Sequence, residues 1–282
     1  MCTLLRHGLF ATISGLILVL GAVVPCGADA QSLRTHLPRS INESAGLGYA
    51  GGEIAGEGHG GQGPAPALTA GTPTAYGAEL GDVFGGVAYQ RYLAAGIPER
   101  DDGAAFIGVG IGDAHEAVGL ELTYAPYDLV EEPLSDGSVS LKIHRHLYRG
   151  LAIAVGMEDL IRYGDRISGS AYVVASQTVR VNRGVLTGMS ATLGVGDGRF
   201  NTMENLSSGT NAAGVFGGLS AQFADRVHVL GTWHGQDLNV GGSFVVPGPV
   251  PMTVTPVWVN VLDEHVDGHR FAISVGTSVQ VL

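Results

Sequence analysis

Two histidines, His144 and His146, stand two positions apart in the segment 138–147. If that segment is a β-strand, both imidazoles lie on the same face, because side chains alternate between the two faces of a strand. Imidazole nitrogens are good ligands for zinc, copper and nickel, so the pair could bind a metal or line a pore beside Lys142 and Ser140. No third ligand is identifiable from the spacing. We therefore predict no metal site and interpret the pair as part of a polar lining.

Other polar groups could support hydrolysis or nucleotide binding. A lipid hydrolase needs a serine or histidine held by an orienting partner, and His228, His234, Ser220 and Ser243 are the candidates. The chain has no G-x-S-x-G motif, and the alternating glycines of 108–112 lack the G-x-G-x-x-G spacing of a phosphate loop. We therefore predict that the protein is not an enzyme and requires no cofactor, and keep a lipid-modifying barrel hydrolase as an alternative.

A third polar cluster, Gln236, Asp237 and Asn239, follows Trp233. Turn chemistry explains residues of these types between two apolar runs. A contact between Trp233 and a glycan is the functional interpretation of the same cluster.

The elements that must position these groups are short runs of β-branched and small residues separated by glycine, aspartate, asparagine and proline. The predicted strands are 83–92, 105–111, 116–124, 138–147, 151–157, 171–181, 185–195, 213–223, 227–233, 238–246, 253–261 and 270–281. Short connections such as 112–113 and 149–150 require antiparallel neighbours. Edge strands must be paired, so we predict an all-β, antiparallel up-and-down β-barrel of about 12 strands, with 10 as the alternative count.

Side chains in these runs alternate between apolar and polar. Val118, Leu120 and Leu122 form an apolar face, whereas Glu121 and Thr123 lie on the other. Mean hydropathy is +0.24 with 15% charged residues, yet after residue 30 no window approaches the roughly 18 apolar residues of a membrane helix. This pattern predicts transmembrane β-strands with lipid on one side. Tyrosines near the predicted strand ends suit the interfacial girdles of such barrels: Tyr89, Tyr92, Tyr124, Tyr127, Tyr148 and Tyr163.

The chain divides into three parts. Residues 1–30 combine a basic start, an apolar stretch and the small-residue motif Ala28-Asp29-Ala30, which predicts a cleaved signal peptide and export. Both cysteines, Cys2 and Cys26, lie in this part. Residues 31–81 are rich in glycine, alanine and proline and predict a flexible segment, and 82–282 form the barrel domain. The net charge of −11 argues against a nucleic-acid partner.

Several glycine-rich hairpin motifs resemble those of one family. The segments are DDGAAFIGVGIGD (101–113), GSVSLKIHRHL (137–147), VFGGLSAQF (215–223) and HRFAISVG (269–276). Together with similar motifs over most of 83–282, they resemble the YjbH-like outer-membrane β-barrel proteins. The resemblance implies a barrel fold and an association with exopolysaccharide production or export, and it supplies no catalytic residues.

The sequence therefore predicts an outer-membrane β-barrel acting as a pore or scaffold. The expected partners are outer-membrane lipid and either polysaccharide or export machinery. A soluble periplasmic or surface β-sandwich that serves as a binding module is the other alternative. The residues expected to line the lumen or bind a ligand are Glu121, Lys142, His144, His146, Trp233, Asp237 and Arg270.

Overall fold

The computed structural model describes residues 68–93, 101–127, 129, 136–164, 169–202, 204–205, 208–210, 212–223, 226–262 and 269–282. The predicted signal peptide and residues 31–67 of the predicted flexible segment lie outside these residues. Within the described part of the chain, no helix is long and apolar enough to cross a membrane.

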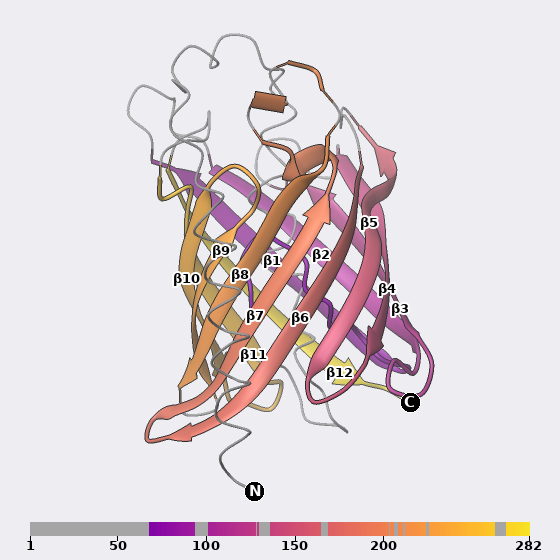
Figure 1. Ribbon diagram of the computed structural model, residues 1–282, viewed down its shortest axis with the longest axis vertical. Helices are drawn as coiled ribbons and strands as arrows, with labels where there is room; N and C mark the ends of the chain where they lie inside the picture. Colours follow the sequence, from indigo (N-terminus) through magenta and orange to yellow (C-terminus); the bar gives the residue numbers. More distant parts are fainter. Residues whose placement is uncertain are drawn as a thin grey trace, which may run out of the picture.

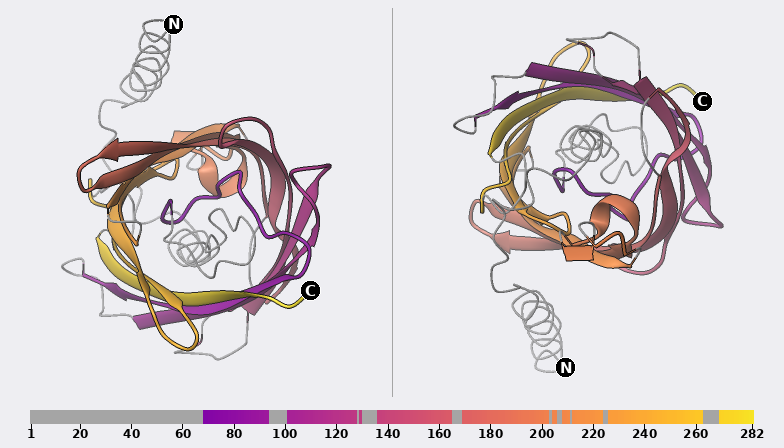
Figure 2. Two further views of the ribbon diagram at one scale, coloured as in Figure 1. Left: turned by 90° about the horizontal axis from the view of Figure 1, so that it is seen from below. Right: turned by 90° about the horizontal axis from the view of Figure 1, so that it is seen from above.

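Twelve antiparallel strands form one closed barrel in which each strand pairs with its neighbours along the chain and β1 pairs with β12 (Figures 1 and 2). The strands are β1 (Asp82–Tyr92), β2 (Asp101–Gly112), β3 (Gly119–Tyr127), β4 (Asp136–His146), β5 (Leu151–Tyr163), β6 (Ser170–Arg183), β7 (Leu186–Gly196), β8 (Gly214–Phe223), β9 (Val227–Trp233), β10 (Leu238–Val246), β11 (Met252–Val259) and β12 (Arg270–Gln280). A short 3-10 helix, η2 (Gly198–Phe200), follows β7. The predicted fold and strand number are confirmed, and the β-sandwich alternative is wrong because one sheet closes on itself.

Strand β5 is longer than predicted, since it continues from Met157 to Tyr163. A bulge interrupts its pairing with β4, between Val139 and Leu141. Asp159 adopts a φ of 52° there, and its backbone N–H donates a hydrogen bond to the Ser140 hydroxyl at 3.0 Å. A bulge adds an unpaired residue and breaks the period of two, which is why the pattern of alternation ended early in the sequence.

Alternate side chains face the lumen and the outside, as predicted. In β3, for example, Glu121 and Thr123 are buried, whereas Tyr124 is exposed. In β12, Arg270 and Ser274 are buried and Phe271 is exposed. The apolar face of each strand therefore points away from the barrel axis.

The outer surface is an apolar belt. Each of the 12 strands carries at least one exposed large apolar side chain, such as Val87 on β1, Ile153 on β5 and Val229 on β9. Charged side chains that point outward lie near strand ends, as Arg91 and Arg145 do one residue from the ends of β1 and β4. Apolar side chains thus cover the outer surface around the whole circumference of the barrel.

Aromatic side chains gather on the outside near the end of the barrel where β1, β3 and β5 finish. They are Tyr89, Tyr124, Tyr163, Trp233, Trp258 and Phe271. The hydroxyls of Tyr124 and Tyr163 share a hydrogen bond of 2.8 Å across two strands. Tyr127, which was predicted to belong to this girdle, instead points into the lumen and is 6% exposed. The side chain of Tyr92 lies outside the described residues.

Residues 68–81, apart from the exposed Leu80, lie inside the barrel, although their composition predicted a flexible segment. Figure 2 shows this segment as an indigo trace within the ring of strands. Leu68 is 7% exposed, and Ala70, Ala75, Tyr76 and Ala78 are at most 1% exposed. The segment enters beside β1 at Gly81 and reaches the opposite end of the lumen at Ala70, which contacts β9 and β10. We call residues 68–81 the plug.

Candidate functional site

The lumen is the candidate functional site, and side chains of its wall bind the backbone of the plug. Thr232 accepts a hydrogen bond from the Ala70 N–H at 3.0 Å, and the Asn239 amide donates to the Ala70 carbonyl at 3.0 Å. Halfway along, Ser176 accepts from the Ala75 N–H at 2.9 Å. Buried backbone groups need partners, and an irregular segment in a barrel obtains them from the wall.

Small residues make room for this close approach. A side chain at Gly110 of β2 would collide with the backbone of Ala78 and Glu79. A side chain at Gly77 of the plug would collide with the ring of His144. The glycines of the wall and the plug therefore have a packing role in addition to bending the sheet.

A buried ion pair anchors the plug near the end of the barrel that carries the short β2–β3 and β4–β5 turns. Glu121 of β3 and Lys142 of β4 stand opposite each other, with 3.2 Å between Lys142 Nζ and Glu121 Oε1. The second carboxylate oxygen of Glu121 accepts a hydrogen bond from the Ala78 N–H at 2.9 Å. The two side chains are 5% and 4% exposed, so the ion pair and its hydrogen bond to the plug are shielded from water.

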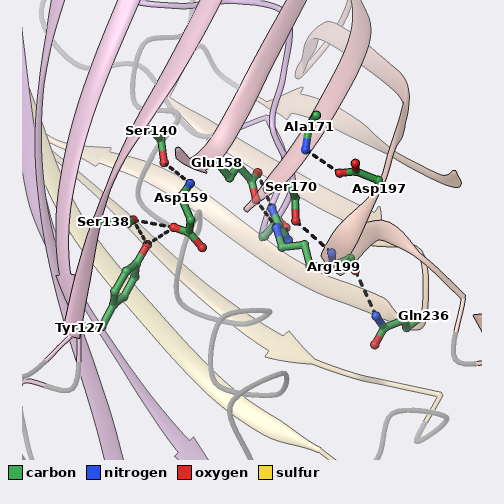
Figure 3. Close-up of polar contacts among 11 residues, drawn as sticks. Tyr127, Ser138, Ser140, Glu158, Asp159, Ser170, Ala171, Asp197, Arg199 and Gln236 are labelled. Carbon is green, nitrogen blue, oxygen red and sulfur yellow. Dashed lines mark hydrogen bonds and ion pairs between the residues drawn. The ribbon is translucent and has the colours of Figure 1, made fainter. Parts of the chain in front are cut away.

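A second buried ion pair anchors the plug near its other end (Figure 3). Arg199 of η2 forms two charge-assisted hydrogen bonds with Glu158 of β5, the one from Nη2 to Oε1 measuring 2.8 Å. The same guanidinium donates to the Gly71 carbonyl at 2.8 Å. The Arg199 backbone is held by Ser170, which accepts from its N–H, and by Gln236, which donates to its carbonyl. Such bidentate geometry fixes η2 inside the barrel.

A hydroxyl network around the β5 bulge lines the neighbouring wall (Figure 3). The Asp159 carboxylate accepts hydrogen bonds from Ser138 at 2.5 Å and from Tyr127 at 3.3 Å. This network explains why Tyr127 faces inward, since its hydroxyl finds partners in the lumen.

The structure brings four of the predicted lumen residues together at the end with short turns. Glu121 and Lys142 form the ion pair, and His144 and His146 follow Lys142 on the same face of β4. His144 is 1% exposed, and its Nε2 lies 3.9 Å from Oε1 of Glu79. His146 Nε2 lies 3.6 Å from the same oxygen.

The other three predicted residues lie elsewhere. Arg270 is fully buried at the opposite end of the lumen, where its Nη1 donates to Gln90 at 3.4 Å. Asp237 is buried in the β9–β10 connection and accepts hydrogen bonds from the backbone N–H groups of Leu238 and Leu262. It therefore stabilises the turn, as the sequence predicted for this polar cluster. Trp233 shares the outward face of β9 with Val229, so it does not line the lumen.

Sequence reasoning missed the plug and three charged residues that contact it or belong to it. Glu79 lay in the predicted flexible segment. Glu158 lay between the predicted strands 151–157 and 171–181, and Arg199 lay between the predicted strands 185–195 and 213–223. The available signal was the presence of the large side chains of Leu68 and Tyr76 within a segment of small residues. That signal does not indicate burial inside a barrel.

His234 makes the stability of the β9–β10 connection depend on pH. It is fully buried, its Nε2 contacts Asn260 Oδ1 at 3.1 Å, and burial lowers its pKa from 6.5 to about 4. The folded protein therefore binds fewer protons here than the unfolded chain between those values. We expect stability to fall by up to about 3 kcal/mol as the pH drops from 6.5 to 4, and to be fully present above 6.5.

Urea unfolding of the detergent-folded protein at several pH values measures this effect. The variant His234→Asn removes the titrating group and should show a shallower dependence over the same interval. An equal slope in the variant and the parent would show that other groups cause it.

Comparisons with known proteins identify no family. No family model matches the chain, and no curated protein matches it. Among solved structures, the crystal structure of Neisserial surface protein A is similar at 10% sequence identity and a TM-score of 0.22, over 71% of this chain and 96% of that one. A likeness at this level carries no argument about function.

Proposed function

We propose that the protein is an outer-membrane β-barrel that acts as a scaffold, with its lumen closed by its own plug. The observation that carries the proposal is the combination of an apolar outer belt with a lumen filled by residues 68–81.

The belt supports a membrane location. Soluble monomers rarely expose contiguous apolar patches larger than a few hundred Å². Here exposed valine, isoleucine, leucine, methionine and aromatic side chains occur on all 12 strands. Backbone groups in hydrocarbon must also be paired internally, and a closed barrel achieves this without an edge. The aromatic side chains outside one end are of the kind that meets lipid headgroups.

The plug favours a scaffold over an open pore. Its backbone is hydrogen-bonded to the wall at both ends and in the middle, and two buried ion pairs hold it. A pore is the second candidate, because the wall beneath the plug is lined by small hydroxyl side chains that water would solvate. Examples are Thr123, Ser140, Ser190 and Thr255. A link to exopolysaccharide export stays a prediction that rests on the resemblance alone.

The two tryptophans of the chain allow a direct test of the membrane location. Trp258 is 46% exposed and lies on the outward face of β11, between Val240 and Phe271. In the variant Trp233→Phe it is the single tryptophan, and its fluorescence is excited selectively above the absorption of tyrosine. After folding into phosphatidylcholine vesicles, we expect lipids brominated near the headgroup end of the acyl chains to quench its fluorescence strongly.

Vesicles of the same lipid without bromine provide the control for folding and light scattering. In cells, the protein should fractionate with outer membranes and migrate differently on a gel before and after heating. Release by osmotic shock together with unquenched Trp258 fluorescence would contradict the proposal.

A further inference from the structure

A cluster of metal-ligating side chains lies where the plug enters the barrel. Glu79 of the plug, His115 of the β2–β3 turn and His146 of β4 each offer one ligand atom, and these atoms all lie within 4.8 Å of one another. From these residues we infer a divalent transition-metal site of the zinc class. The three ligands come from the plug, a turn and a strand, which the pairing of β1 to β4 brings to one end of the barrel.

The distances suit coordination better than direct hydrogen bonding. Glu79 Oε1 lies 3.6 Å from His146 Nε2, which is beyond hydrogen-bond length. Ligand atoms at about 2.0–2.1 Å from one tetrahedral metal are about 3.4 Å apart, close to this value. His115 is exposed, so its side chain can make the remaining approach.

Glu79 is held with one oxygen directed at the cluster. Its Oε2 accepts a hydrogen bond from the Ala114 N–H at 2.8 Å, and its own N–H donates to Asp82 at 2.8 Å. Its Oε1 is buried and has no hydrogen-bond partner in the described part of the chain. A buried carboxylate oxygen without a partner is costly, and a cation would satisfy it.

His144 provides a second observation at the same place. Its ring is 1% exposed, neither ring nitrogen has a hydrogen-bond partner among the described residues, and Nε2 lies 3.9 Å from Glu79 Oε1. Two buried polar groups therefore face each other here without a hydrogen bond, and an ion bound by Glu79 would satisfy its oxygen, since buried polar atoms are normally satisfied.

The donor set selects the class of metal. Imidazole nitrogens suit Zn²⁺, Ni²⁺ and Cu²⁺, whereas Ca²⁺ and Mg²⁺ require oxygen ligands. The turn that carries His115 is ordered by Asp113, whose Oδ1 accepts hydrogen bonds from the backbone N–H groups of His115 at 2.8 Å and Glu116 at 3.0 Å.

The site would tie the plug to the barrel wall. Glu79 is part of the plug, while His115 and His146 belong to the wall. The His115 and His146 rings stack at a centroid distance of 4.2 Å, so the exposed His115 must turn its ring for both imidazoles to face one ion. Binding of a metal ion by these three residues should therefore raise the temperature at which the barrel unfolds.

Isothermal titration of the untagged, detergent-folded full chain with ZnCl₂ tests the inference. We expect one Zn²⁺ per chain and an affinity at least about tenfold lower in His115→Ala, His146→Ala and Glu79→Gln. His269→Ala, a change at the opposite end of the barrel, should bind like the parent. Zn²⁺ should raise the temperature of the heat-dependent gel shift in the parent and in His269→Ala only.

Three results would overturn the site: no Zn²⁺ binding by the parent, parental affinity in the three ligand variants, or displacement of Zn²⁺ by an equal concentration of Ca²⁺. The gel shift verifies that each variant is folded before titration. His115→Ala keeps the test decisive should a change at a more buried ligand prevent folding, because His115 is exposed. Titration in detergent does not depend on the membrane location or on the scaffold role.

Discussion

Replacing Arg199 with methionine is expected to destabilise the folded barrel by about 3–5 kcal/mol. The change leaves the Glu158 carboxylate buried without its two charge-assisted hydrogen bonds, and it removes the hydrogen bond to the Gly71 carbonyl of the plug. Methionine keeps a similar length, so lost packing contributes little. Urea unfolding in detergent micelles, followed by tryptophan fluorescence, measures the difference.

Two further variants separate the ion pair from general damage. Arg183→Met makes the same change at an exposed site near the end of β6 and should alter stability by no more than about 0.5 kcal/mol. The double variant Glu158→Gln with Arg199→Met removes the uncompensated charge and should recover a large part of the loss. Equal stability of the double and single variants would contradict the argument from an unpaired buried charge.

Deleting residues 68–79 is expected to convert a closed barrel into a conducting one. Eight-stranded barrels are filled by their own side chains, whereas barrels of about 16 strands leave an aqueous channel. This barrel has 12 strands and a wall rich in glycine and hydroxyl residues, so the plug occupies space that the wall does not fill. Planar-bilayer recordings should show channel openings for the deletion and none for the full chain.

The control is a deletion of the same length at 40–51, outside the described residues. It leaves the plug in place and should show no channel openings. A milder variant covers the case in which the plug deletion does not fold. Ser176→Ala, Thr232→Ala and Asn239→Ala together remove three wall contacts to the plug, and they should produce brief openings. Equal conductance of the full chain and the deletion, or a folded but silent deletion, would contradict the role of the plug.

The strands were predictable because their information is local. Alternation such as Leu120, Leu122 and Tyr124 against Glu121 and Thr123 follows from the period of two, and it identified both the strands and their faces. It also placed Lys142 and His144 correctly in the lumen. The end of β5 was missed because the bulge at Asp159 interrupts that period. Trp233 lies on the outward face of β9, and its contact with a glycan stays a prediction.

Local patterning by itself determined the all-β class, the antiparallel order and the apolar outer face, since each depends on residues a few positions apart. Only the closed tertiary structure decided what fills the lumen. The plug carries small, polar residues without periodicity, and its burial depends on partners such as Ser176, 101 positions away, and Asn239, 169 positions away. The cluster of Glu79, His115 and His146 likewise depends on tertiary structure, because the pairing of β1 to β4 places the plug, a turn and a strand at one end of the barrel.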